Sequence, residues 1–348
     1  MEKARFKWVL RERNRKIAAK TEVFTEQQAR RVRSFHSSFK EYSPTPLIEL
    51  TSLAQHLGIK NLFVKDESYR FGLNAFKVLG GSFAIGSYIA NELGEDIDDL
   101  PYMRLVSDEV RSLLGSKTFI TTTDGNHGRG VAWTANRLKQ QAIVYMPQGS
   151  AAERLANIRA EGAQAEITDM NYDDTVRYTS ELAQKNGWII VQDTAWDGYT
   201  RIPLWIMQGY MTMALEAYEQ LPVKPTHIFL QAGVGSLAGS VQGFFADIYG
   251  SSCPLTFIVE PKGADCLYQT AAANDGSLHS VTVRLETIMA GLACGEPNSI
   301  AWEILGNLSD GFISCPDYTA AQGMRILGNP LAGDTKVSAG ESGAATVG

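Results

Sequence analysis

The stretch "HIFLQAGVGSLAGS", residues 227 to 240, joins a short apolar run to a glycine-rich turn. A second apolar run, "LTFIVEP" at 255 to 261, follows at a distance that one helix fills. A strand, a helix and another strand in this order predict parallel strands covered by helices. In open parallel sheets ligands bind where a strand ends and a helix begins, so this turn is a candidate for function.

The same alternation continues along most of the chain. Past "SPTPL" at 43 to 47, whose prolines indicate an extended entry, apolar runs bounded by polar or glycine residues lie at 61–67, 117–123, 141–147, 164–170, 188–193, 227–233 and 255–261. Helical patterns lie between them, for example at 126–140, 151–162 and 202–221. We therefore predict an α/β fold of parallel sheets covered by helices, with no internal repeat and no low-complexity linker.

The composition is that of an ordinary water-soluble globular protein. The chain has 348 residues, of which 44% are hydrophobic and 20% are charged, and this length suggests about two domains. No uninterrupted apolar run approaches the ~18 residues of a membrane span, and the N-terminus lacks the apolar stretch of a secretory signal. We expect a cytoplasmic protein without a membrane partner. The four cysteines are far apart and in no CxxC pair, so they indicate free thiols, and no metal site is predicted.

Charge is uneven along the chain. Residues 1 to 40 carry a local net charge of +8, although the whole chain carries −6. An Arg-rich and acid-poor start is found in transit peptides and nucleic-acid-binding arms. Four glutamates and several aromatic residues interrupt the basic run here. This pattern favours an ordered extension that packs on the body or on a second subunit, and no nucleic-acid partner is expected.

Three glycines shape the turn of the opening stretch. Gly233, Gly235 and Gly239 let the backbone close tightly around an anion, and the N–H groups of the turn and of the following helix start suit a phosphate. A tight turn without a ligand is the first alternative. The second is a dinucleotide site of a nicotinamide or flavin oxidoreductase, because Glu260 lies about 20 residues further on, where such sites place a ribose-binding acid.

A second turn, "TTTDGNHGRG" at 121 to 130, also lies between a predicted strand and a predicted helix. Its residues would cap a helix in any protein, and capping alone is one interpretation. The turn also presents backbone N–H groups suited to a carboxylate, the amide of Asn126 and the carboxylate of Asp124. A small amino-acid substrate would find its binding partners there.

Lys77 is the one charged residue of "FGLNAFKVLGG" at 71 to 81. An exposed lysine on a helix flank is the ordinary interpretation. The alternative is a desolvated lysine whose uncharged amine forms a Schiff base. A reactive lysine, a phosphate turn and a carboxylate turn together describe pyridoxal 5'-phosphate, which takes the amine, anchors its phosphate at a helix start and acts as an electron sink.

At these residues the chain resembles the fold type II, or tryptophan synthase β-like, group of pyridoxal-phosphate enzymes. The motifs run in the order of that group, from "SPTPL" through "NAFK", "TDGNHG" and "AGVGSLAG" to "GLACGEPN" at 291 to 298. Within the group, "FGLNAFKVLGGSFA", "TTTDGNHGRGVAW" and "GMRILGNPLAGD" (323 to 334) are similar to the diaminopropionate ammonia-lyases. Relatives acting on serine, threonine or O-acetylserine usually have no aspartate within the asparagine turn.

The resemblance implies a domain organisation. The cofactor would lie in the cleft between two parallel-sheet domains, and the protein would be a homodimer. The larger, cofactor-binding domain would comprise residues 41–85 and 195–348, the smaller one residues 86–194, after a basic extension of residues 1–40.

The resemblance also implies a role for each site residue. Lys77 would carry the Schiff base, Asn126 would bind the ring oxygen, and Gly291 would let the backbone lie close to the ring. The phosphate would be lined by Gly233, Val234, Gly235, Ser236 and Leu237. The substrate carboxylate would be seated by Thr123, Gly125 and His127. Asp193 and Tyr172 would face the distal amine, although Asp193 would also serve as an ordinary strand-end cap.

The implied reaction is the α,β-elimination of 2,3-diaminopropionate to pyruvate and two molecules of ammonia. An amine on Cβ leaves poorly unless it is protonated, so the site needs acidic groups there and a base at Cα. With Lys77 on one face and Asp124 on the other, either enantiomer would lose its α-proton. The alternatives are a serine or threonine dehydratase and a cofactor-binding protein without turnover.

One departure from the family concerns the end of the chain. The family supplies a Ser or Thr hydroxyl to the pyridine nitrogen from a segment near its C-terminus, whereas this sequence stops at "VSAGESGAATVG". We expect a C-terminally incomplete sequence, with Ser338 or Ser342 as the substitutes to consider.

Overall fold

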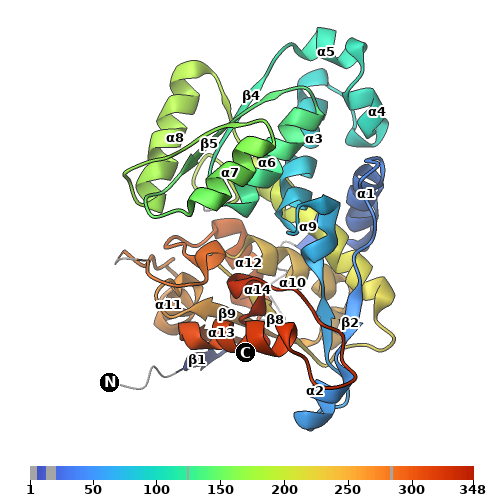
Figure 1. The fold of residues 1–348 in the computed structure, drawn as a ribbon, viewed down its shortest axis with the longest axis vertical. Coiled ribbons are helices and arrows are strands. Elements are labelled where there is room, and N and C mark those ends of the chain that lie inside the picture. Colours follow the sequence, from blue (N-terminus) through green and yellow to red (C-terminus); the bar gives the residue numbers. More distant parts are fainter. Residues whose placement is uncertain (1–5, 13–20, 124, 283–284) are drawn as a thin grey trace. The chain divides into compact units, whose positions relative to one another are not determined.

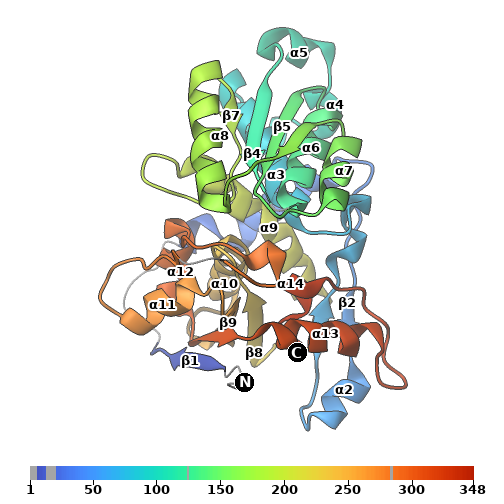
Figure 2. The same cartoon turned by 60° about the vertical axis from the view of Figure 1, so that its left-hand side comes forward.

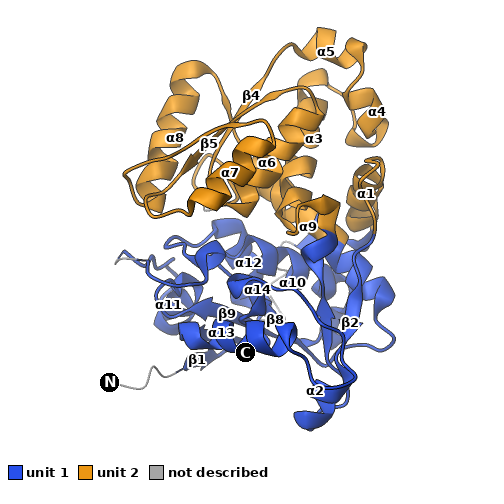
Figure 3. Cartoon of the chain, in the orientation of Figure 1, with its two compact units in different colours: residues 1–26, 44–69, 213–348 blue, residues 27–43, 70–212 orange. Residues whose placement is uncertain are grey.

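The computed structural model describes residues 6–12, 21–123, 125–282 and 285–348 (Figure 1). The chain forms two compact units (Figure 3). Unit 1 comprises Met1–Glu26, Pro44–Tyr69 and Met213–Gly348, and unit 2 comprises Gln27–Ser43 and Arg70–Thr212. Among the described residues, none of the helices is long and apolar enough to cross a membrane.

Unit 2 contains the predicted 86–194 segment and adds residues on both sides of it. The reason is close helix packing through glycines. A Cβ at Gly130 would lie 2.8 Å from the Cα of Val78, and one at Gly80 would lie 2.6 Å from the ring of Tyr210. Helix α3 (Lys77–Leu93) therefore lies against both α6 (Asn126–Arg137) and α9 (Arg201–Gln220), and a domain boundary at residue 85 would cut through it.

The sheet of unit 2 is entirely parallel, with strand order β6-β5-β4-β7. Its strands are β4 (Thr118–Thr122), β5 (Gln141–Met146), β6 (Gln164–Ile167) and β7 (Ile189–Ile190). Helix α8 (Tyr172–Asn186) covers one face, and α3 and α6 lie on the other, beside α7 (Ala152–Ala160) (Figure 2). The parallel sheet expected from the alternation of strands and helices is confirmed.

The sheet of unit 1 has the order β1-β10-β9-β8. Strands β8 (His227–Gln231), β9 (Leu255–Pro261) and β10 (Gly311–Cys315) are parallel, and β1 (Lys7–Leu10) joins the edge antiparallel to β10. The helices of this part of the unit are α10 (Ser236–Tyr249), α11 (Cys266–Ala273), α12 (Ser299–Leu308) and α13 (Asp317–Gly328). The sequence patterns predicted β8 and β9 but neither β1 nor β10.

The basic N-terminal region packs on the body wherever it is described, as expected. Strand β1 pairs with β10. Phe24 is fully buried, and a Cβ at Gly243 of α10 would lie 2.9 Å from its ring. In unit 2, α1 (Glu26–Ser37) buries Phe35, whose ring lies against the backbone of Gly86.

Strand β3 (Phe63–Lys65) differs from the expectation. It pairs antiparallel with β2 (Leu47–Glu49) in a separate two-stranded sheet, with α2 (Thr51–His56) between them in sequence. A short apolar run predicts a strand but does not specify its pairing partner. The remaining short helical segments are η1 (Thr21–Val23), η2 (Glu67–Gly72), η3 (Ile97–Asp99), α4 (Tyr102–Leu105), α5 (Asp108–Leu114), η4 (Gly250–Ser252), η5 (Ala290–Leu292) and α14 (Glu341–Ala344).

Candidate active site

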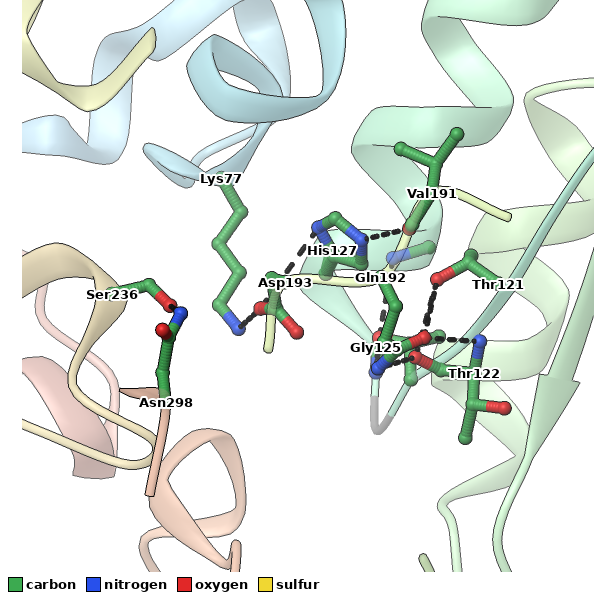
Figure 4. A network of polar contacts seen from close by, with 12 residues as sticks. Lys77, Thr121, Thr122, Gly125, His127, Val191, Gln192, Asp193, Ser236 and Asn298 are labelled. Carbon is green, nitrogen blue, oxygen red and sulfur yellow. Dashed lines mark hydrogen bonds and ion pairs between the residues drawn. The ribbon is translucent and has the colours of Figure 1, made fainter. Parts of the chain in front are cut away.

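Lys77 is the first residue of α3 and points at a carboxylate of the same unit. Its Nζ donates a hydrogen bond to Oδ2 of Asp193 over 2.7 Å, and the two side chains are only 20% and 8% exposed (Figure 4). The backbone enters α3 through left-handed residues at Phe71 and Asn74, with φ of 50° and 58°. An exposed lysine on a helix flank is therefore excluded for Lys77.

Asp193 follows β7, and its carboxylate faces both Lys77 and His127. Burial alone raises the pKa of its carboxyl group, but the Lys77 ammonium and the nearby His127 ring outweigh that effect and lower the pKa to about 2. Nε2 of His127 donates to the carbonyl of Val191 over 2.7 Å, and its Nδ1 lies 4.0 Å from Oδ2 of Asp193. Asp193 is therefore ionised at neutral pH.

The turn after β4 is held by its own threonine. Oγ1 of Thr123 accepts hydrogen bonds from the N–H groups of Gly125 (2.9 Å) and Gly128 (3.2 Å). Thr123 and His127 are buried, whereas Asn126 is exposed at the first residue of α6. Asp124 lies outside the described residues. In this structure the hydroxyl of Thr123 and the N–H group of Gly125 are bonded within the turn.

Tyr172 begins α8, and its hydroxyl oxygen accepts a hydrogen bond of 2.8 Å from the side-chain amide of Gln192. Sequence reasoning did not single out Gln192, which is 1% exposed. Its neighbour Asp193 was identified through the family resemblance, although a polar residue at the end of a predicted strand is also a signal in the sequence. The same signal would have drawn attention to Gln192.

Unit 1 carries the second group of predicted residues, at the start of α10. Gly235 has φ of 104°, and a Cβ there would lie 3.2 Å from Ala301. Because α10 begins at Ser236, its first-turn N–H groups lie beside this turn, which is the arrangement that binds phosphate. Val234 and Ser236 are buried, and Leu237 is half-buried.

Asn298 ties this turn to α12 and was also missed. It is fully buried, its Nδ2 donates to Oγ of Ser236 over 2.8 Å, and its N–H group donates to the carbonyl of Val234 over 2.8 Å (Figure 4). Its Oδ1 accepts from the N–H groups of Ile300 and Ala301 at the helix start. Its position at the end of the "GLACGEPN" motif was the available signal.

Gly291 lies beside the same turn, in η5. A Cβ added to Gly233 would come within 3.5 Å of the carbonyl oxygen of Gly291. The N–H group of Gly291 donates to Oγ of Ser342 over 3.1 Å, whereas Ser338 is exposed. Unit 1 thus brings Gly233, Gly291 and Ser342 together.

Glu260 does not fit the dinucleotide interpretation. It is fully buried, its Oε1 accepts from the N–H group of Leu267 (2.9 Å), and its Oε2 accepts from that of Tyr268 (2.7 Å). Burial raises the pKa of this carboxyl group well above its ordinary value. Because both oxygens cap α11 inside the core, this side chain does not bind a ribose hydroxyl.

The chain is similar to known pyridoxal-phosphate dependent enzymes. Residues 39–348 match the family described as "Pyridoxal-phosphate dependent enzyme". The chain is 52% identical over 330 residues to the diaminopropionate ammonia-lyase of Escherichia coli (strain K12), covering 94% of this chain and 81% of that protein. It is 53% identical over 322 residues to the enzyme of Salmonella typhimurium, covering 91% and 80%.

The chain is also similar to solved structures of diaminopropionate ammonia-lyase. The holo diaminopropionate ammonia-lyase of Escherichia coli superposes with a TM-score of 0.91 at 49% identity, covering 99% of this chain and 85% of that one. The same enzyme in complex with an aminoacrylate-pyridoxal phosphate azomethine intermediate gives a TM-score of 0.89, again at 49% identity and with 99% and 85% covered.

Proposed function

The chain belongs to the diaminopropionate ammonia-lyases of the pyridoxal-phosphate dependent enzyme family, and we propose that it converts 2,3-diaminopropionate and water to pyruvate and two molecules of ammonia. The reaction breaks the bond between Cβ and its nitrogen after the proton on Cα has been removed. Water then releases the second nitrogen from the three-carbon product.

The described residues fit the cofactor. Lys77 offers a half-buried primary amine, and α10 begins directly after a turn in which Gly235 has the left-handed backbone that favours glycine. Lys77 would hold the cofactor covalently, residues 233–237 would hold its phosphate, and Gly291 would lie along its ring. When bound, the cofactor supplies an electron sink for negative charge at Cα.

One observation supports a diamino acid as the substrate: Asp193 already binds a primary ammonium group. The Nζ of Lys77 lies 2.7 Å from its carboxylate, which is 8% exposed. The distal ammonium of diaminopropionate is the same chemical group. A serine hydroxyl carries no charge, so it would not supply the positive charge that Lys77 supplies to this carboxylate in the structure. This contrast favours the lyase over a serine or threonine dehydratase.

Each unit 2 residue then has a chemical task. The Lys77 amine takes the α-proton on its face of the substrate. Asp193 stabilises the protonated form of the distal amine, the form in which an amine leaves carbon. Tyr172 is hydrogen-bonded to Gln192, the residue directly before Asp193. We assign Tyr172 to the distal amine as well. Asn126 would bind the ring oxygen, and Thr123, Gly125 and His127 would shape the turn for the substrate carboxylate.

The product balance tests the proposed function. We expect the purified protein, supplied with pyridoxal phosphate, to release two ammonia molecules for each pyruvate formed from diaminopropionate. A coupled assay with lactate dehydrogenase measures the pyruvate, and one with glutamate dehydrogenase measures the ammonia. Equal amounts of pyruvate and ammonia from serine, at a higher rate than from diaminopropionate, would instead support the dehydratase.

Stereochemistry tests Asp124 as the base on the second face. Asp124→Asn keeps the shape of the side chain but removes the base, so turnover of D-diaminopropionate is expected to fall by the ~10²–10⁴ typical of a lost general base. Turnover of the L isomer should fall less, because Lys77 serves it. Separate kcat values for the two isomers check this, and equal losses would contradict it.

We further propose that the protein is a homodimer located in the cytoplasm, as expected from the sequence. Light scattering of the purified protein tests the assembly.

A further inference from the structure

The side chain of Gln192 uses its full hydrogen-bonding capacity inside unit 2. Its Oε1 accepts from Oγ1 of Thr121 and from the N–H group of Thr122, each over 3.0 Å. Its Nε2 donates to the carbonyl of Thr122 over 3.1 Å (Figure 4). The same nitrogen donates to the hydroxyl oxygen of Tyr172 over 2.8 Å. An amide has two acceptor sites and two N–H groups, so all four are occupied.

The backbone of Thr122 determines which way this amide points. Its N–H group is only a donor and its carbonyl is only an acceptor, so the oxygen and nitrogen of the Gln192 amide are not interchangeable. The nitrogen therefore faces Tyr172, and the tyrosine oxygen accepts in that bond. It follows that the hydroxyl proton of Tyr172 points away from Gln192.

The backbone at Gln192 is held as firmly as its side chain. Its N–H group donates to the hydroxyl of Tyr199 over 2.9 Å, and that hydroxyl donates to the carbonyl of Ile190 over 3.0 Å. Burial raises the pKa of Tyr199, so this hydroxyl keeps its proton. Gln192 thus links the end of β7, directly before Asp193, to the end of β4.

We propose that Gln192 is a positioning residue that orients the hydroxyl of Tyr172 for departure of the distal amine. This inference rests on the proposed function, in which Tyr172 contacts that amine. While it is an ammonium, the amine is only a hydrogen-bond donor. As the bond to Cβ breaks, the electron pair of that bond moves to nitrogen and becomes an acceptor. Under this proposal the tyrosine proton, which Gln192 does not accept, is the one donated to this electron pair.

Two substitutions test this orientation. The carboxylate introduced by Gln192→Glu accepts instead of donating, so it turns the Tyr172 proton back toward itself, and Gln192→Met removes the interaction. We expect each substitution to lower kcat roughly 10- to 100-fold, because the Tyr172 hydroxyl would no longer be held in the reactive orientation. The change in KM should be smaller. Thr179→Val is the matched control, because Thr179 is equally buried and bonds to Oγ1 of Thr122 over 2.7 Å. Its kcat should stay near that of the wild type.

A double-mutant cycle with Tyr172→Phe separates positioning from general stability. If Gln192 acts through the tyrosine hydroxyl, Gln192→Met should cost much less activity in the Tyr172→Phe background than in the wild type. Multiplicative losses, or losses matched by Thr179→Val, would overturn the proposal. So would wild-type kcat in either Gln192 variant.

Hydrogen exchange tests the contact of Gln192 with the end of β4 independently of turnover. The N–H group of Thr122 donates a hydrogen bond to Oε1 of Gln192. Gln192→Met should therefore speed hydrogen exchange at this N–H group, whereas Thr179→Val should not. If the wild-type protein releases no pyruvate from diaminopropionate, the proposed function fails. Faster exchange in Gln192→Met would then still show that Gln192 holds the end of β4. Unchanged exchange would refute that role of Gln192.

Discussion

Replacing Lys77 by alanine is expected to abolish pyruvate release from diaminopropionate. The variant loses the amine proposed to hold the cofactor and to take the α-proton, and loss of a general base alone costs ~10²–10⁴ in rate. It also leaves the buried carboxylate of Asp193 without its ammonium partner at 2.7 Å. Pyruvate assays and the visible absorbance of the protein mixed with pyridoxal phosphate measure the two losses.

Lys77→Arg is the matched control for this change. Arginine keeps a positive charge beside Asp193 but does not form a Schiff base, so this variant should stay folded and still be inactive. Reduction of the wild-type protein with borohydride in the presence of the cofactor should label Lys77. A label on another lysine would contradict the assignment.

Asp193→Asn is expected to have the second largest effect. The amide keeps the size of the side chain but loses the charge that we propose to bind the distal ammonium, so kcat/KM for diaminopropionate should fall by roughly 10²–10⁴. Turnover of serine, which has no distal charge, should fall much less. Steady-state kinetics on both substrates measure the ratio, and equal losses would mean that Asp193 does not recognise the second amine.

A second buried ion pair provides the control for Asp193→Asn. In unit 1, Nζ of Lys65 lies 2.9 Å from Oε2 of Glu216, with side chains 11% and 1% exposed. Glu216→Gln therefore also leaves a buried lysine without its charge partner. It should lower the unfolding temperature as Asp193→Asn does, but it should not change the preference for diaminopropionate over serine.

The pH dependence of unfolding gives a further check on Asp193 in the free protein. Its pKa is lowered from 3.8 to about 2 in the folded state. A lowered folded-state pKa adds stability above the unfolded value, and this stability is lost as the pH falls from about 4 toward about 2. Asp193→Asn should lack this part of the acid destabilisation, as measured by urea unfolding across that range.

The fold could be predicted from local patterns where strands and helices alternate regularly. Strands β4 to β9 coincide with apolar runs, and α6, α7 and α9 coincide with helical patterns. Strands β1 and β10 were missed, and the antiparallel partner of β3 was not foreseen. Strand pairing depends on contacts between segments far apart in the chain, and an apolar run of a few residues does not encode its partner.

The reactive groups could be predicted because residue type and position after a strand already limit their chemistry. Lys77 in an apolar stretch, and the glycines before α10, pointed to a Schiff base and a phosphate. In contrast, the positions of Gln192 at a strand end and of Asn298 at the end of a motif did not reveal their buried hydrogen bonds. A buried amide in a sequence has the same appearance as an exposed one.

The sequence by itself determined the kind of chemistry, through a lysine, a glycine turn and an aspartate-containing turn placed at the ends of predicted strands. Only the tertiary structure decided which carboxylate meets Lys77, since Asp193 lies 116 residues away along the chain. It also decided that this carboxylate stays ionised in a buried place, and that the proton of Tyr172 points away from Gln192. These properties depend on distances of a few ångströms between remote segments, which folding sets and local sequence does not.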